Sequence, residues 1–329
     1  WAEDSVGRRQ YQLFVKDLSA GRTLNDTVEN IEPNLVWADD NRTLFYIEKD
    51  PLTLLSKCVK THVLGTDSDQ DQLVYEESDE SFYMGISRTR SEQFICITVQ
   101  STVSTEQRIT PAAKPAEFTV IAKRERDVEY AADHLNGRWM IRTNWDAPNF
   151  RLMTLDDRQP LGDRGDWREF IAHQADVFIE DFELFTGFVA IEERSNGLLR
   201  LRTVSDSFKN EFVASEEAAY AMGLNVNANP DTPWLRYVYM SLTTPNTIYE
   251  VNTESGERKL LKRDPVLGGY DADDYVTERQ WATARDGTKI PVSLVFKKGF
   301  KKDGSAALLQ YAYGSYGSSS DPRFSVVNV

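Results

Sequence analysis

The sequence predicts a mostly β protein whose short antiparallel strands are grouped into repeated sheets. Short apolar runs, each opened by a polar turn, recur between residues 10 and 264. Comparable runs are separated by roughly 45 to 50 residues, which is the length of a four-stranded propeller blade. Hardly any helical period is visible before residue 208. We therefore predict an incomplete β-propeller, followed by a segment of a different kind.

The first elements are two strand pairs. Residues 10–18 (QYQLFVKDL) read as a strand that ends at the turn 19–21. Residues 34–37 (NLVW) and 44–47 (LFYI) read as a second pair, separated by a polar turn.

Comparable apolar runs then recur five times along the chain. A single sheet cannot bury both of its faces, so we expect neighbouring sheets to stack. The regular spacing favours a propeller over a β-sandwich, which would not need it. The last run is followed by a hairpin of residues 247–252 and 258–261. The five runs are 44–47 (LFYI), 94–97 (FICI), 139–141 (WMI), 188–191 (FVAI) and 237–239 (YVY).

Two stretches interrupt this pattern. Residues 211–224 (EFVASEEAAYAMGL) could form a helical turn or a loop, either as an inserted connection, which we favour, or as a lid. Residues 265–274 (PVLGGYDADD) are acidic and rich in turn formers, and we predict a linker there. The predicted organisation is a propeller at 1–264, the linker at 265–274 and a truncated second domain at 275–329.

The second domain begins with a hairpin. Residues 275–284 and 290–296 read as strands joined by an Asp-Gly turn, and a basic loop follows at 297–304. Residues 308–313 (LLQYAY) then read as a buried strand that stops at the loop 314–317 (GSYG). This order of elements is how an α/β-hydrolase domain starts, and the serine, acid and histidine of that fold come later in the chain.

Composition restricts the partners. The formal charge of -14 disfavours nucleic acid and anionic membranes, and it favours cationic ligands such as peptides rich in Lys and Arg. The charge could equally serve solubility alone. Cys58 and Cys96 lie far apart without metal-type spacing, which indicates free thiols in a reducing compartment, so we expect a cytoplasmic protein. The chain starts at Trp1 without a visible signal peptide, and we expect it to be part of a longer protein.

Metal and cofactor chemistry have no sequence support. His62, His134 and His173 are isolated in the sequence, which is typical of structural histidines. Residues 67–71 (DSDQD) resemble the opening of a calcium loop, but Gln72 and Ser78 stand where that loop requires Gly and Glu. We expect neither a metal ion nor another cofactor.

Candidate catalytic groups gather near the end of the chain. The Gly-x-Ser-x-Gly motif of a hydrolase nucleophile is absent, so Ser315 reads as a turn residue. Tyr311, Tyr313 and Tyr316 could pack on a sheet. Alternatively, a phenol at the tip of a strand could donate a hydrogen bond to a developing oxyanion, because tyrosine keeps its proton at neutral pH.

Several segments together resemble the oligopeptidase B branch of the prolyl oligopeptidase family of serine peptidases. The resemblance extends in order over essentially the whole chain. Its segments are 34–37 (NLVW), 62–66 (HVLGT), 70–77 (QDQLVYEE), 124–130 with His134, 241–245 (SLTTP), 284–287 (ARDG), 291–295 (PVSLV) and 311–317 (YAYGSYG).

The resemblance implies a seven-bladed propeller over an α/β-hydrolase domain, in a cytosolic peptidase that cleaves short peptides after Arg or Lys. It makes Tyr313 the oxyanion-hole donor, although Ala312 replaces the Gly that the family has between its two tyrosines. The catalytic triad and the acidic residues that read the substrate would follow Val329. A propeller of this kind admits thin peptides, and its opening would hinge at Gly268 and Gly269.

We therefore predict an N-terminal fragment of such a peptidase, inactive by itself because an oxyanion donor needs a nucleophile and a base. The alternative is a non-catalytic propeller that binds basic peptides or a protein partner, although a pure scaffold has no need of residues 311–317. A secreted propeller is a further alternative, which disulfide mapping would reveal.

The fragment is also predicted to associate with itself, because an incomplete sheet at 275–329 leaves strand edges that invite pairing. Light scattering on residues 1–329 should show a mass that rises with concentration. A monomer that persists at high concentration would contradict this prediction.

Overall fold

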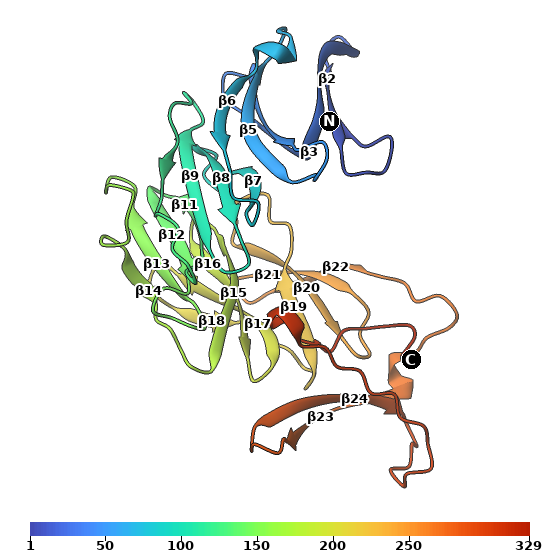
Figure 1. Ribbon diagram of the computed structural model, residues 1–329. Coiled ribbons are helices and arrows are strands. Elements are labelled where there is room, and N and C mark those ends of the chain that lie inside the picture. The colour runs from blue at the N-terminus through green and yellow to red at the C-terminus, as the bar shows by residue number, and fades with distance from the viewer. The chain divides into compact units, whose positions relative to one another are not determined.

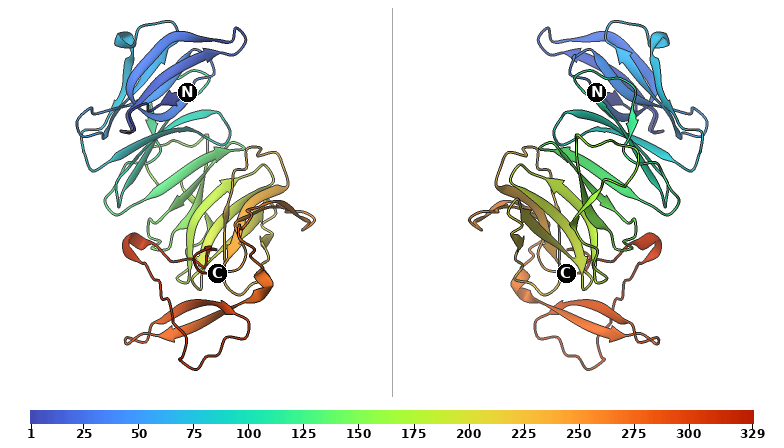
Figure 2. Two further views of the ribbon diagram at one scale, coloured as in Figure 1. Left: turned by 90° about the vertical axis from the view of Figure 1, so that its right-hand side faces the viewer. Right: turned by 90° about the vertical axis from the view of Figure 1, so that its left-hand side faces the viewer.

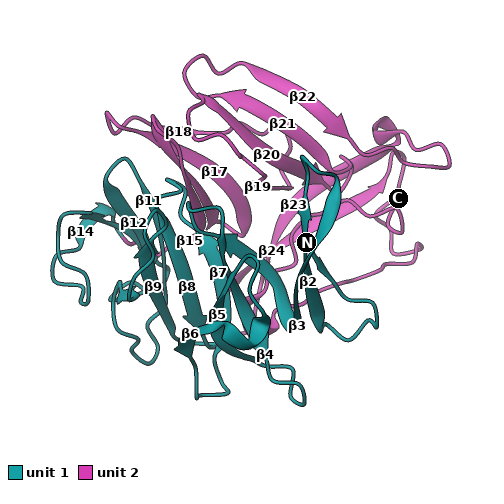
Figure 3. Cartoon of the chain, turned by 90° about the horizontal axis from the view of Figure 1, so that it is seen from above, with its two compact units in different colours: residues 1–172 teal, residues 173–329 magenta.

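The computed structural model describes residues 1–329 and contains almost only antiparallel strands, with three short 3-10 helices: η1 Ser68–Gln70, η2 Ala272–Asp274 and η3 Ser315–Gly317. Figure 1 shows the order of these elements along the chain. The chain divides into two compact units, Trp1–Ala172 and His173–Val329, which Figure 3 colours teal and magenta. No helix is long and apolar enough to cross a membrane.

Unit 1 contains three sheets in which consecutive strands are hydrogen-bonded neighbours. This up-and-down order follows from short turns between the strands, which only antiparallel neighbours allow. The first sheet is β1 Ala2–Glu3, β2 Tyr11–Asp17, β3 Arg22–Trp37, β4 Thr43–Lys49, β5 Ser56–Val63 and β6 Gln72–Glu76. The second is β7 Tyr83–Arg88, β8 Phe94–Gln100, β9 Thr105–Pro111 and β10 Thr119–Val120. The third is β11 Tyr130–Leu135, β12 Arg138–Thr143, β13 Arg151–Asp156 and β14 Arg168–Ile171.

Unit 2 contains two further four-stranded sheets and a separate hairpin. Figure 2 shows the hairpin, in orange, as a two-stranded ribbon. The first sheet is β15 Val177–Leu184, β16 Phe188–Ser195, β17 Leu198–Ser205 and β18 Asn210–Phe212. The second is β19 Tyr220–Leu224, β20 Trp234–Ser241, β21 Thr247–Asn252 and β22 Arg258–Arg263. The hairpin is β23 Tyr275–Thr283 and β24 Lys289–Lys297.

All five predicted apolar runs are interior strands of sheets: they lie in β4, β8, β12, β16 and β20. In β8, Ile95, Ile97 and Val99 pack in one core cluster with side chains of the first sheet, while Cys96 packs with those of the third sheet. Successive side chains of a strand point to opposite faces, so both faces of the second sheet are buried within unit 1. The predicted stacking of neighbouring sheets is confirmed there.

The predicted hairpins are confirmed as well. β3 pairs with β4 through Leu35 and Tyr46, β21 and β22 form the expected hairpin, and β23 pairs with β24 along its whole length. The turn between β23 and β24 contains Gly287, whose φ of +89° is the left-handed conformation that glycine tolerates.

One expectation was wrong, and another holds only in part. Residues 211–224 form no helical turn: they contribute the last residues of β18 and all of β19, and only residues 213–219 between these strands form a connection. Residues 308–313 form no strand, and Leu308, Leu309 and Tyr311 are between 77% and 81% exposed. A strand needs a hydrogen-bonded neighbour, and the only sheet formed after residue 264 is the β23–β24 hairpin. Apolar content was therefore a poor guide in this segment.

The β16–β17 turn brings one of the four-stranded sheets of unit 2 into contact with this hairpin. Asn196 and Gly197 have φ values of +51° and +70°, as in a two-residue type I′ turn. The Arg279 guanidinium of β23 donates a hydrogen bond to the Asn196 carbonyl. A Cβ atom on Gly197 would lie 2.8 Å from Cγ of Pro291 in β24, so only glycine allows this close approach.

Gly197→Ala should therefore cost about 2 to 4 kcal/mol of unfolding free energy, from left-handed strain plus overpacking against Pro291. Gly256→Ala is the matched control, since Gly256 has a φ of +74° with no atom within 4 Å of the added Cβ. The control should cost only the strain, about 1 to 2 kcal/mol. Urea unfolding of both variants measures the difference, and equal costs would show that the turn does not press on the hairpin.

Candidate functional site

The candidate site is the loop that contains Tyr313, and the loop is closed by the side-chain hydroxyl of Ser320. The Tyr313 N–H donates a 2.9 Å hydrogen bond to Oγ of Ser320, and that hydroxyl lies 3.4 Å from the Tyr313 carbonyl oxygen, to which it can donate. Residues 313 and 320 are thus held together across the intervening turn. The side chain of Tyr313 is about half exposed.

The tip of this loop reverses direction through two left-handed residues. Tyr316 has φ 58° and ψ 32°, and Gly317 has φ 73°. The Ser318 N–H donates to the Ser315 carbonyl, which completes η3. Ser315 is therefore a turn residue in the structure, as expected from the missing elbow motif.

The tyrosines of the loop do not pack on a sheet. Tyr311 and Tyr316 are 79% and 95% exposed, so the predicted sheet packing is wrong. An exposed phenol in a closed loop can donate a hydrogen bond to a group that approaches it, which is what an oxyanion donor must do. This geometry is compatible with the role predicted for Tyr313, which stays a prediction.

The predicted hinge lies in a turn. Gly268 and Gly269 have φ values of +99° and +85° with no atom within 4 Å of an added Cβ. Directly after them, the Tyr270 hydroxyl donates to the Thr243 carbonyl, and the ring of Tyr270 packs on Tyr275 and Phe324. The two glycines are thus unrestrained beside an anchored residue, and their role as a hinge stays a prediction.

An ion cluster attaches the end of the chain to a sheet of the same unit. Arg194 of β16 contacts Asp321 through Nη1 at 2.6 Å and Glu180 of β15 through Nε at 2.8 Å. The Asp321 side chain is only 6% exposed. Burial acts to lower the pKa of Arg194, but the two carboxylates raise it overall, so the guanidinium stays charged.

His62 and His134 have polar side-chain partners, as expected of structural histidines, and His62 is far from isolated in space. Its Nδ1 lies 2.8 Å from Asp71 and its Nε2 lies 3.2 Å from Asp26, and the imidazole is almost fully buried. The Tyr46 hydroxyl also donates to Asp71. The Asp71 carboxylate, which the calcium-loop resemblance would have used, is therefore occupied by side chains of unit 1. His134 contacts Ser91 and Asp157.

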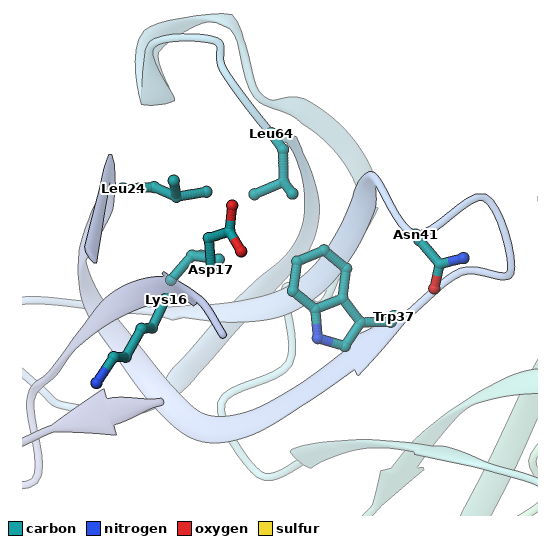
Figure 4. A pocket seen from close by; sticks show the side chains of 7 residues that line it. Lys16, Asp17, Leu24, Trp37, Asn41 and Leu64 are labelled. Carbon is teal, nitrogen blue, oxygen red and sulfur yellow. The ribbon is translucent and has the colours of Figure 1, made fainter. Parts of the chain in front are cut away.

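A shallow cleft lies in each unit, and neither cleft is lined by Tyr313. The cleft in unit 1, of about 380 Å³, is drawn in Figure 4, where Leu24, Leu64 and Trp37 surround the Asp17 carboxylate. The cleft in unit 2, of about 400 Å³, is lined mainly by hydroxyl and charged side chains such as Thr203, Lys209 and Asp231. No cluster of three or more His, Cys, Asp or Glu side chains could hold a metal ion.

The consecutive four-stranded sheets, each an up-and-down meander, define a β-propeller domain, and comparison with known proteins agrees. Residues 1–264 match the family described as "Prolyl oligopeptidase, N-terminal beta-propeller domain". The chain belongs to the prolyl oligopeptidase family of peptidases.

Individual relatives place the chain within this family. Dipeptidyl aminopeptidase BI of Pseudoxanthomonas mexicana is 59% identical and aligns with 100% of this chain and 45% of its own length. Protease 2 of Moraxella lacunata is 31% identical, over 98% of this chain and 46% of its own length. Oligopeptidase B from Leishmania major has a TM-score of 0.89 at 30% identity, over 99% of this chain and 47% of that structure. The chain thus spans less than half the length of these relatives.

Sequence reasoning missed the Arg194–Asp321 contact beside the candidate site and the His62 cluster of unit 1. Neither feature joins neighbours in the sequence. Arg194 and Asp321 are 127 residues apart, and His62 lies 9 residues from Asp71 and 36 residues from Asp26. The Asn196–Gly197 dipeptide was a readable signal, because Asn-Gly between two apolar runs is typical of a tight hairpin.

Low pH should lower the stability of unit 1, because the Asp26 carboxylate becomes protonated. Burial acts to raise the pKa of this carboxyl, but hydrogen bonds from the Gly65 N–H and His62 lower it overall from 3.8. A carboxyl whose folded pKa is depressed contributes stability above its unfolded pKa and loses it as the pH falls. Asp26→Asn should therefore cost about 1 to 3 kcal/mol at neutral pH. The difference from the parent chain should shrink between about pH 5 and pH 3.

Urea unfolding at several pH values measures this difference. Asp69→Asn removes an exposed carboxylate from the neighbouring η1 and controls for the lost charge. A penalty for Asp26→Asn that stays constant down to pH 3 would show that the carboxylate contributes nothing through its charge.

Proposed function

We propose that this chain is the N-terminal part of a serine oligopeptidase that hydrolyses short peptides after Arg or Lys. The observation that carries the proposal is the match of residues 1–264 to the propeller domain of a peptidase family. The Tyr313 loop follows that domain and supports a catalytic use of the whole protein. The two buried free cysteines support a reducing, cytoplasmic location.

Residues 275–329 would begin an α/β-hydrolase domain that continues beyond them. The β23–β24 hairpin has the place and length expected of the first strands of such a domain. The apolar side chains of Leu308, Leu309 and Tyr311 are exposed here and would be covered when residues 308–311 pair within a larger sheet. The serine, acid and histidine of the triad would come from that larger domain.

Tyr313 would stabilise the transition state by donating its phenol proton as a hydrogen bond to the oxyanion. Preorganised donors of this kind act on charge that develops only during the reaction, so they increase kcat more than substrate affinity. The propeller would restrict the substrate to thin, flexible peptides, and hinge motion at Gly268 and Gly269 would admit them.

Preference for cationic substrates is supported by charge. The chain carries 52 acidic and 38 basic side chains, and a negative field concentrates cationic peptides near the protein. This field affects encounter, whereas the choice of the cleaved bond would depend on residues of the hydrolase domain.

A second candidate is the removal of dipeptides from free N-termini. It is favoured by the name of the relative with 59% identity, a dipeptidyl aminopeptidase. The two activities differ in one requirement, since only an aminopeptidase needs a free amino terminus two residues before the cleaved bond. A non-catalytic scaffold for basic peptides is the remaining alternative.

Chromogenic peptides distinguish these functions. The full-length protein should hydrolyse an N-acylated substrate with Arg before the chromophore, and a serine-directed inhibitor should stop the reaction. Residues 1–329 alone should show no turnover, because they lack a nucleophile and base.

The matched substrate is a free dipeptide with the same Arg before the chromophore. Turnover of this substrate alone would replace the oligopeptidase proposal with the aminopeptidase. Turnover by residues 1–329 that the inhibitor abolishes would contradict the predicted inactivity, and no turnover by the full-length protein would favour the scaffold.

A further inference from the structure

The Arg194 cluster, which consists of Arg194, Glu180 and Asp321, is the one buried ionic contact between the end of the chain and the sheets of unit 2 among the ion pairs of the structure. Glu180 is the extra residue of a β-bulge, because the register between β15 and β16 passes from Ile179–Glu193 to Asp181–Glu192. A bulge redirects a side chain, and here the Glu180 carboxylate reaches Nε of Arg194. The guanidinium is thereby oriented before it meets Asp321.

Asp321 is held more firmly than an exposed residue of a terminal segment would be. Its Oδ1 accepts a hydrogen bond from Nη1 of Arg194, and its Oδ2 accepts a 3.3 Å hydrogen bond from Nη2 of Arg323. Arg194 is 19% exposed, whereas Arg323 is 60% exposed. A buried, charge-assisted contact constrains geometry far better than an exposed one, so Arg194 fixes the position of Asp321.

The residue before Asp321 transmits this position to the candidate oxyanion donor. Ser320 accepts the Tyr313 N–H and lies within hydrogen-bond distance of the Tyr313 carbonyl through the same hydroxyl. Tyr313 is therefore connected to the sheet in three steps. Arg194 binds Asp321, Asp321 follows Ser320 in the chain, and the Ser320 hydroxyl contacts the backbone N–H and carbonyl of Tyr313. No other side chain forms a hydrogen bond with the backbone of residues 311–317.

We propose that Arg194 and Asp321 are positioning residues, which hold the backbone of Tyr313 so that its hydroxyl is aimed at the reaction centre. The inference rests on the proposed function, because it presumes that Tyr313 is the oxyanion donor. It assigns to the propeller sheet β15–β16 a direct part in the geometry of catalysis. The sheet would then do more than exclude large substrates.

The test is a double-mutant cycle in the full-length enzyme, with kcat and KM measured on the chromogenic peptide that it hydrolyses. Tyr313→Phe should lower kcat about 10² to 10³-fold, as expected for the loss of one oxyanion donor. Asp321→Asn should lower kcat about tenfold with KM nearly unchanged, because misplacement of a catalytic group acts on the transition state. Asp321→Asn added to Tyr313→Phe should cause no further loss, since the phenol that it positions is gone.

Two further variants separate positioning from stability. Ser320→Ala leaves the ion cluster intact and should reproduce the loss of kcat, which also keeps the test decisive if Asp321→Asn fails to fold. Arg323→Gln is the matched control, because it removes the exposed partner of the same carboxylate, and it should leave kcat within about twofold. Arg194→Gln should lower kcat. Arg194→Lys should restore part of this loss, because lysine keeps a positive charge beside the Asp321 carboxylate.

The outcomes are distinguishable. An unchanged kcat in Tyr313→Phe would overturn the role of Tyr313 in the proposed function, and the inference with it. A normal loss in Tyr313→Phe, with full kcat in both Asp321→Asn and Ser320→Ala, would overturn the inference alone. Losses that multiply in the double variant would show that Asp321 does not act through the Tyr313 hydroxyl, and would overturn the inference. A lower melting temperature with unchanged kcat would show that the cluster only stabilises the fold.

Discussion

The structure depends on the burial of both faces of each interior sheet. In β8, alternate side chains enter two different cores, one shared with the first sheet and one with the third. In unit 2, Leu201 of β17 packs with Met222 of β19 and Tyr237 of β20, which joins the two four-stranded sheets. A lone meander would leave one apolar face in water, so each sheet requires its neighbour.

The end of the chain is attached by a different kind of interaction. The β23–β24 hairpin and the segment after it contact the four-stranded sheets of unit 2 through directional polar groups and one close approach at a glycine. These are the Arg279–Asn196 hydrogen bond, the Arg194–Asp321 ion pair and the contact of Gly197 with Pro291. Such contacts define geometry more than they contribute free energy, since a buried ion pair roughly offsets its own desolvation. They suit a junction whose residues must be placed accurately.

The same junction contains two features with opposite consequences for motion. Gly268 and Gly269 have open space around them, which favours movement, whereas Tyr270 is anchored to Thr243 and packs on Phe324. A hinge motion at Gly268 and Gly269 would therefore act directly beside the Tyr270–Thr243 hydrogen bond. The proposed function would use both properties, a flexible connection that admits peptides and a closed state with a defined position for Tyr313.

The sequence by itself determined the repeat of apolar strands, the turns between them and the hairpin at residues 275–297, because these follow from local alternation and turn chemistry. The sequence also sufficed to identify the family. Tertiary structure decided that residues 308–313 stay exposed and unpaired, that His62 lies between two carboxylates and that Arg194 reaches Asp321. The physical reason is that pairing, burial and ionic contact depend on partners that are distant in the chain, and a single segment carries no information about which partner will face it.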